Sequence, residues 1–178
     1  QRQIVFRLVA HEERPLVIDA DGLNALAGAL ELQRDFRARA ILTPHPGEYL
    51  RLASGLGIEA SLGSNSGREE AAIELARRLG AVVVLKGPAT VVTDGQQLFV
   101  NDTGNQGLAT AGSGDVLTGV CAGFLAQFEG QLSMLECAAL AVHVHGRAAE
   151  RCTEDRGDTR LLARELLDGI PAAIAEIS

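Results

Sequence analysis

Short apolar runs alternate with amphipathic helical patterns along the first half of the chain. Strands are predicted at Leu16–Ile18, Ala40–Leu42 and Ala81–Leu85. The last of these is an unbroken apolar run, which is typical of a parallel strand that is buried on both faces. Helical patterns separate the strands, at about residues 22–32, from Pro46 onward and at 68–79. The alternation predicts an α/β domain with a largely parallel central sheet.

The remaining segments predict one hairpin and several helices. Residues 91–93 and 98–100 flank Asp94-Gly95, which indicates a β-hairpin, and residues 2–10 favour a helix. Residues 55–67 form a polar connection rich in glycine and serine. From residue 114 the chain is expected to be mostly helical, at 114–128, 133–152 and 159–168, with a short turn after Pro171. Ser133 and Glu136 form the pattern of a capping box at the start of the second of these helices.

Composition limits the possible partners and compartments. A length of 178 residues with 47% hydrophobic and 22% charged residues predicts one globular domain, and no apolar run is long enough to cross a membrane. A net charge of −7 argues against nucleic acid as a partner, because phosphate contacts need clustered basic residues. The three cysteines are odd in number and lack CxxC spacing, which favours a reducing compartment. A cytoplasmic location is therefore expected.

A glycine-rich segment at residues 105–118, reading NQGLATAGSGDVLT, indicates phosphate chemistry. Glycines let the backbone turn and let a ligand approach it closely. Unpaired amides at the positive end of the helix that follows would then bind an anion. Asp115 lies at this junction, where a carboxylate beside phosphate suggests a base. The alternative is an ordinary glycine-rich loop in which Asp115 is only a favourable first-turn residue.

Polar residues follow each of the three predicted parallel strands. They are Asp19 and Asp21, then Thr43 and His45, then residues 86–90. Carboxyl ends of parallel strands share one edge of a sheet, where open α/β folds bind ligands. Lys86 is also the only lysine among sixteen basic residues, which favours a specific use of its compact ammonium group. These three groups are expected to meet near the glycine-rich segment.

Four motifs carry a family resemblance that covers nearly the whole chain. They are PLVIDADGLNAL at 15–26, LTPHPGEYLRL at 42–52, VVVLKGPATVV at 82–92 and GNQGLATAGSGDVLTG at 104–119. Together they resemble the ADP/ATP-dependent NAD(P)H-hydrate dehydratases, a branch of the ribokinase-like superfamily. The resemblance implies a three-layer α/β/α fold. Domains of that family carry an additional N-terminal part, so residues 1–178 are expected to be the C-terminal portion of a single such domain.

The resemblance implies repair of damaged nicotinamide cofactors. Such an enzyme is a carbon–oxygen lyase that dehydrates the hydrated forms of NADH and NADPH through a phosphorylated intermediate, with ADP giving AMP and phosphate. Mg²⁺ is expected to accompany the ADP or ATP. The implied partners are the two substrates, a second copy of the chain in a homo-oligomer, and an epimerase domain or protein that acts on the same hydrate.

The resemblance also implies roles for single residues. Asp115 would be the general base and contact the substrate, and His45 would contact the substrate. The nucleotide would be bound by Lys86, Gly87, Pro88, Ala89, Thr90, Asn105, Ala111, Gly112, Ser113 and Gly114. Asn24 and Glu48 would support phosphate or hydrated magnesium, and no residue is expected to ligate a metal directly.

Two other functions stay open from the sequence. A ribokinase-like kinase for a vitamin precursor would use the same Asp115, although TPHPGE at 43–48 favours the dehydratase. A non-catalytic nucleotide-binding fragment is the second alternative. A Rossmann dehydrogenase is disfavoured because no GxGxxG follows the early strand.

Overall fold

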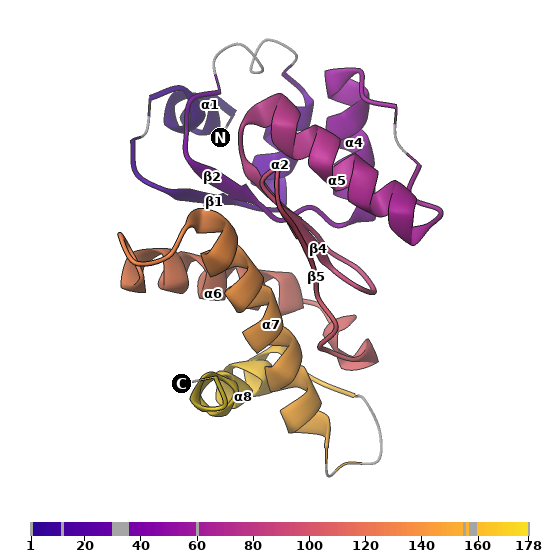
Figure 1. Cartoon of the computed structure of the whole chain (residues 1–178), viewed down its shortest axis with the longest axis vertical. Coiled ribbons are helices and arrows are strands. Elements are labelled where there is room, and N and C mark those ends of the chain that lie inside the picture. The colour runs from indigo at the N-terminus through magenta and orange to yellow at the C-terminus, as the bar shows by residue number, and fades with distance from the viewer. Residues whose placement is uncertain are drawn as a thin grey trace. The chain divides into compact units, whose positions relative to one another are not determined.

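The computed structural model describes residues 2–11, 13–29, 36–59, 61–154, 156 and 160–177. These residues belong to two compact units, Gln1–Val100 and Asn101–Ser178, which we call the first and the second unit. Within the described ranges, the first unit contains the β-sheet and the second is built from helices (Figure 1).

The first unit is organised by a five-stranded sheet. Its strands are β1 (Leu16–Ile18), β2 (Ala40–Leu42), β3 (Val82–Leu85), β4 (Val91–Thr93) and β5 (Leu98–Val100), in that spatial order. β1, β2 and β3 are parallel, whereas β4 pairs antiparallel with β3 and with β5. The predicted α/β fold, the parallel strands and the hairpin are therefore confirmed. The three-layer order stays a prediction.

Four helices complete the described residues of the first unit. They are α1 (Arg2–His11), α2 (Asp21–Ala27), α4 (Pro46–Leu56) and α5 (Asn65–Leu79). α5 lies along β3 and β4, and α2 contacts both α1 and α4 (Figure 1). The core between them includes fully buried Tyr49, whose hydroxyl donates to the Ala71 carbonyl at 3.0 Å. Burial, together with the charge of Glu74, raises the pKa of Tyr49 to about 12.

The helix ends of the first unit differ from the predicted ones by a few residues. α5 begins at Asn65 rather than at 68, because the Ser64 hydroxyl accepts the Gly67 amide at 3.1 Å and so caps the helix. α4 continues to Leu56, into the segment predicted as a connection. α2 ends at Ala27 rather than near residue 32, and residues 30–32 of that prediction lie outside the described ranges.

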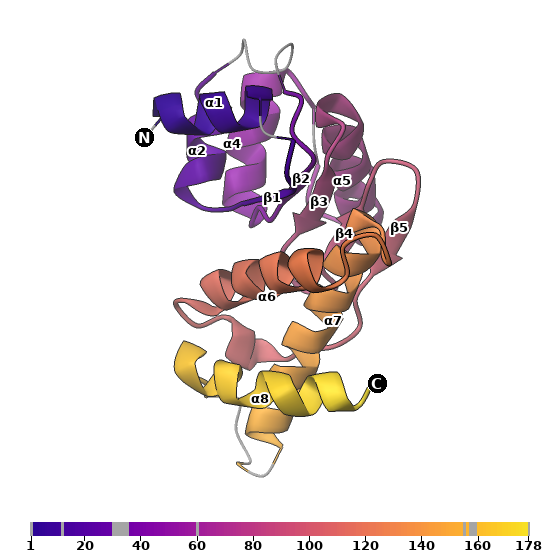
Figure 2. The same ribbon diagram turned by 90° about the vertical axis from the view of Figure 1, so that its left-hand side faces the viewer.

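The regular elements in the described residues of the second unit are all helical. A 3₁₀ turn, η1 (Gln106–Leu108), precedes α6 (Ser113–Gln127), α7 (Met134–Thr153) and α8 (Ala163–Ala175). α7 packs against both α6 and α8 (Figure 2). Its start confirms the predicted capping box, since the Ser133 hydroxyl accepts the Glu136 amide at 3.2 Å and Glu136 Oε2 accepts the Ser133 amide at 2.8 Å.

The last helix corrects the sequence prediction. A helix at 159–168 and a separate turn after Pro171 were expected, but α8 runs unbroken from Ala163 to Ala175 with Pro171 inside it. Residue 159 lies outside the described ranges. Proline costs the helix one hydrogen bond, yet Leu166, Gly169 and Ala173 are all buried on the same face and hold both halves of the helix in place.

No helix in the described part of the chain is both long and apolar enough to span a bilayer.

Candidate functional site

In the first unit, polar side chains meet at the carboxyl edge of the parallel strands. Asp19 follows β1, Thr43 follows β2 and Lys86 follows β3. Lys86 Nζ lies 2.9 Å from Asp19 Oδ1 and 3.8 Å from Glu48 Oε2. Residues far apart in the sequence thus form one cluster, as the strand pattern predicts for this edge. Asp21 is exposed instead, in the first turn of α2.

Hydrogen bonds and opposite charges hold the Asp19 carboxylate in its ionised form. Burial raises the pKa of Asp19, but hydrogen bonds from Lys86 and Thr43 and the charge of Lys86 outweigh it, so the pKa lies below its ordinary value. Only 21% of the Lys86 side chain and 11% of the Asp19 side chain are exposed, so water screens the pair incompletely. The single lysine therefore occupies a defined position between two carboxylates.

His45 has a structural role, as a helix cap, that the sequence did not predict. Its Nδ1 accepts the Gly47 amide at 3.0 Å and the Glu48 amide at 3.4 Å. The bond from the Glu48 amide, together with Glu48 Oε2 accepting the His45 amide at 2.8 Å, forms a capping box at the start of α4. This use fixes the ring and leaves half of the side chain exposed. His45 is therefore held in one orientation with its Nε2 edge 3.5 Å from Glu48 Oε1.

Residues 86–90 form a tight exposed turn after β3. Gly87 has a φ of 142°, and the Thr90 hydroxyl donates to the Gly87 carbonyl at 3.0 Å. That φ favours glycine, because residues with a side chain rarely adopt it, and a Cβ at Gly87 would also lie 2.6 Å from Arg68 Nη1. Arg68 Nη2 in turn donates to the Leu85 and Lys86 carbonyls at 3.3 and 3.4 Å. Sequence reasoning missed Arg68, because its place in an amphipathic helix carries no sign of this contact.

The two residues predicted to support phosphate or magnesium are already engaged within the protein. Asn24 Oδ1 accepts Arg51 Nε at 2.8 Å, and the buried Glu48 carboxylate caps α4 beside Lys86. In the described ranges, no group of three or more His, Cys, Asp or Glu residues is arranged to hold a metal ion. A cation directly ligated by Glu48 would compete with Lys86, so this donor set does not fit a protein-ligated metal.

In the second unit, α7 holds the first residue of the glycine-rich segment and the two residues that precede it. The Gly104 amide donates to Glu150 Oε1 at 2.7 Å, and the Thr103 hydroxyl donates to the His143 carbonyl at 3.0 Å. Asn105 Nδ2 donates to the Thr153 hydroxyl at 2.7 Å, while its Oδ1 accepts the Gly107 amide at 2.9 Å. Both ends of the Asn105 side chain are thus used to anchor η1.

The end of the segment turns into α6. Gly112 has a φ of 85° and lies just before the first helical residue, and a Cβ there would lie 3.1 Å from Ala163 Cβ. The Ser113 amide donates to the Thr110 carbonyl at 3.3 Å. The amides of Gly112 and Gly114 find no acceptor among the described residues. Asp115 is exposed in the first turn of the helix.

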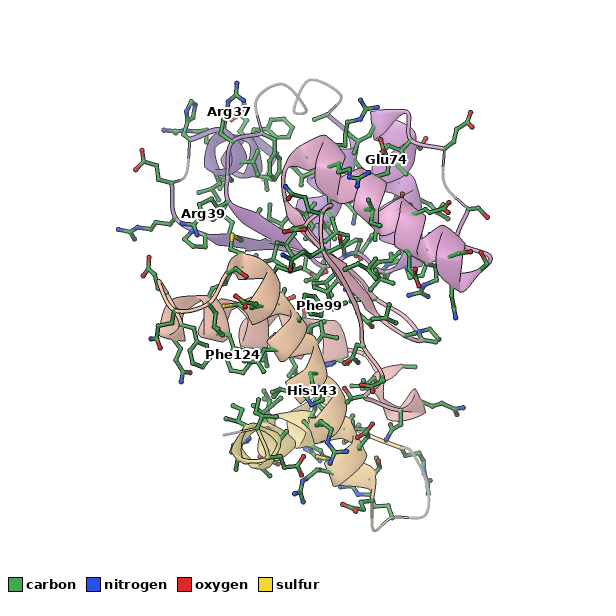
Figure 3. The ribbon with its side chains drawn as sticks, in the orientation of Figure 1. Arg37, Arg39, Glu74, Phe99, Phe124 and His143 are labelled. Atoms are coloured by element: carbon green, nitrogen blue, oxygen red, sulfur yellow. The ribbon has the colours of Figure 1, made fainter. Side chains whose placement is uncertain are left out.

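His145 is a second residue that sequence reasoning missed. It is buried in α7, and its Nε2 lies 2.9 Å from the Ser113 carbonyl oxygen. His143 lies two residues earlier on the same helix (Figure 3) and is half-buried. The spacing of the two histidines predicts different faces of the helix, but it gives no sign that one of them reaches the start of α6.

An open hollow lies beside the glycine-rich segment within the second unit. Its volume is about 780 Å³, and it is lined by residues of η1 and the following turn and by residues that precede or begin α8. The lining residues are Gln106, Gly107, Ala109, Thr110, Arg156, Arg160, Leu161, Leu162 and Glu165. Arg156 Nη2 forms an ion pair with Glu165 Oε1 at 3.0 Å.

Known proteins match the chain over most of its length. The NAD(P)H-hydrate dehydratase family profile matches residues 1–172. The chain is 39% identical over 163 residues to the ADP-dependent (S)-NAD(P)H-hydrate dehydratase of Neisseria meningitidis serogroup B, covering 89% of this chain and 53% of that protein. It is 46% identical over 176 residues to a bifunctional NAD(P)H-hydrate repair enzyme of Salinibacter ruber, covering 98% of this chain and 31% of that protein.

A solved structure agrees with these relatives. The ADP/ATP-dependent NAD(P)H-hydrate dehydratase from Bacillus subtilis, co-crystallised with ATP and Mg²⁺, aligns with a TM-score of 0.74 and 35% identity, covering 92% of this chain and 55% of that one. The fold is thus ribokinase-like. The chain spans about half the length of two of these relatives and about a third of the third. It belongs to the NAD(P)H-hydrate dehydratase family.

Proposed function

We propose that the protein dehydrates the hydrated forms of NADH and NADPH in a nucleotide-dependent reaction, with ADP converted to AMP and phosphate. One observation carries the proposal. The chain belongs to this family, and its exposed Asp115 lies in the first turn of α6. Directly before Asp115 is a glycine turn, residues 111–114, in which the Gly112 and Gly114 amides find no acceptor among the described residues. That combination suits proton removal beside a bound phosphate.

The chemistry explains why a base and an anion site belong together. Hydroxide is a poor leaving group, so Asp115 removes the proton of the C6 hydroxyl while that oxygen forms a bond to the terminal phosphorus of the nucleotide. The bond from this phosphorus to the bridging oxygen breaks and releases AMP. The lone pair of the ring nitrogen then expels phosphate from C6, and loss of a proton from C5 restores the reduced nicotinamide. The glycine-turn amides stabilise charge on the phosphate oxygens.

The first unit supplies the remaining roles in the proposal. Residues 86–90 line the nucleotide, and the Lys86 ammonium, now paired with Asp19 and Glu48, acts as a point charge toward phosphate. The half-exposed ring of His45 contacts the hydrate. In the second unit, Asn105 and residues 111–114 form a wall of the nucleotide site, and the adjoining hollow has the volume of an ordinary small-molecule site.

Magnesium enters this proposal with the nucleotide. The protein donors near Lys86 do not fit a directly bound cation, so Asn24 and Glu48 would act on its water shell or on phosphate. When bound, the ion neutralises phosphate charge. The Bacillus relative was co-crystallised with ATP and Mg²⁺, which supports this choice of co-substrate.

We also propose the partners that the family suggests. These are a homo-oligomer in the cytoplasm and an epimerase domain or protein that acts on the same hydrate. The Salinibacter relative is a bifunctional repair enzyme, which supports a second repair activity beside this one.

The direct test is to incubate the chain with ADP, Mg²⁺ and NADH hydrate and to follow the return of reduced-nicotinamide absorbance. Asp115→Asn keeps the shape of the side chain and should lower turnover by roughly 10²–10⁴-fold, the usual contribution of a general base. Asp102→Asn, at an exposed carboxylate in the same unit, is the matched control and should keep normal turnover.

Three results would point elsewhere. Near-normal turnover in Asp115→Asn would remove the base from the mechanism. A phosphorylated product that accumulates without free phosphate would indicate the vitamin-precursor kinase. Absence of turnover by the chain alone, with recovery on mixing with the part of the Neisseria relative that this chain does not match, would indicate the non-catalytic nucleotide-binding fragment.

A further inference from the structure

The peptide between Ser113 and Gly114 lies in the first turn of α6, at the proposed anion site. Gly112 precedes it with a φ of 85°, and Gly114 follows without a side chain, so side-chain sterics add little to the restraint that the helix places on this peptide. In a trans peptide the carbonyl and the amide point in opposite directions. A rotated peptide would therefore turn the Ser113 carbonyl oxygen, instead of the Gly114 amide, toward a phosphate.

One buried side chain opposes that rotation. His145 Nε2 lies 2.9 Å from the Ser113 carbonyl oxygen, and only 6% of the His145 residue is exposed. Since a carbonyl oxygen can only accept, the imidazole must carry hydrogen on Nε2 and donate it. Fixing the carbonyl on one side of the peptide directs the Gly114 amide to the opposite side.

The helix that carries His145 is itself anchored to the same segment. A Cβ at Gly146 would lie 2.2 Å from Thr103 Oγ1, which shows how closely α7 approaches the segment. Gly104 and Asn105 are bonded to Glu150 and Thr153 of the same helix. α7 thus holds the glycine-rich segment near its beginning and, through His145, at its end.

We infer that His145 is a positioning residue of the nucleotide site, which fixes the Ser113–Gly114 peptide so that the Gly114 amide faces bound phosphate. The inference rests on the proposed function, because it assumes that phosphate binds at this turn. His145 touches neither substrate nor nucleotide in this role. It acts through the peptide that it orients.

The test follows the Gly114 amide resonance of ¹⁵N-labelled protein during titration with ADP and Mg²⁺. In the unsubstituted chain this resonance should shift on binding. His145→Leu fills the space without a donor, and should raise the dissociation constant of ADP roughly three- to tenfold and reduce the Gly114 shift, as for one lost hydrogen bond. His145→Gln, which keeps a donor of similar reach, should recover most of both effects. His143→Leu is the matched control and should match the unsubstituted chain, because its side chain points elsewhere on the same helix.

Each contrary result has one meaning. Equal ADP affinity and equal Gly114 shifts in His145→Leu and the unsubstituted chain would overturn this inference and leave the proposed function standing. A Gly114 resonance that ignores ADP in the unsubstituted chain would overturn both. A ¹⁵N spectrum of the unsubstituted chain that shows His145 Nε2 without a hydrogen would overturn the inference even if the variants failed to fold.

Discussion

Lys86 is held by two carboxylates, and its removal should be costly. Lys86→Met would leave Asp19 and Glu48 close together with little exposure to water. Breaking a fully buried pair costs about 3–5 kcal/mol, and the partial exposure here reduces the expected loss to about 2 kcal/mol. Urea unfolding at neutral pH measures this loss. Arg39→Met, at an exposed cation in the same unit (Figure 3), should change stability by less than about 0.5 kcal/mol. Equal effects of both substitutions would contradict the importance of the pair.

Asp19 should make stability depend on pH in the acid range. Its folded pKa lies below the ordinary value of 3.8, so the native state favours the ionised carboxylate. The resulting stability is fully present above pH 3.8 and is lost as the pH falls through the folded pKa. Asp19→Asn should therefore be less stable than the unsubstituted chain at about pH 6, and the difference should shrink below about pH 4. A difference that stays constant across urea titrations in this range would be the contrary result.

The sequence predicted these residues to different degrees. Asp19, Thr43 and Lys86 were expected at one edge because each follows an apolar strand, and that reasoning needs only the direction of the strands. Their pairing could not be predicted, since it depends on side-chain conformations across β2. Arg68 and His145 were missed for a related reason. Both donate to backbone carbonyls, which every residue possesses, so no sequence pattern marks the acceptor.

At the level of elements, two glycines in neighbouring helices should respond in opposite ways to the same substitution. Gly146→Ala would place a Cβ 2.2 Å from Thr103 Oγ1 and 2.7 Å from the Thr103 carbonyl carbon, so the segment must move away from α7. We expect a loss of about 1–3 kcal/mol. Gly119→Ala in α6 meets no atom within 4 Å and should gain about 0.5–1 kcal/mol from helix propensity. Urea unfolding of both variants tests the contrast, and two changes of the same sign would contradict it.

Helix and strand identities were predictable where periodicity was strong, and the boundaries were less so. The start of α7 followed from Ser133 and Glu136, because a capping box is a local pattern. The continuity of α8 did not, because the burial of Leu166 and Ala173 outweighs the local effect of Pro171 and depends on packing. His45 was equally hidden as a helix cap, since Ser, Thr, Asp and Asn are the usual residues there.

At the scale of the whole molecule, the proposed function assigns roles in both units to a chain that spans about half the length of its dehydratase relatives. Ligand binding to the native state should appear as added stability. At a concentration of ADP 100 times its dissociation constant, the expected gain is about 2.7 kcal/mol.

The phosphates should account for that gain. ADP with Mg²⁺ should raise the thermal midpoint in a dose-dependent way, whereas adenosine at the same concentrations should raise it far less, because the glycine-turn amides have no anion to bind. Hydrogen exchange should slow at residues 104–115 in the ADP sample. Equal stabilisation by adenosine would show that the nucleoside without its phosphates drives binding, and would contradict the assignment of the glycine turn to phosphate.

The pairing of Lys86 has a practical consequence. Lys86 is the one lysine of the sequence, so it carries the only side-chain primary amine. An acylating reagent can therefore attach to a single side-chain amine, Lys86 Nζ, and the mass of the peptide that contains Lys86 separates this label from one on the terminal amine. The labelling rate reports how often the amine leaves its two carboxylate neighbours. A nucleotide that draws Lys86 toward its phosphates should change this rate, so one reagent and one peptide mass become a sensor of occupancy.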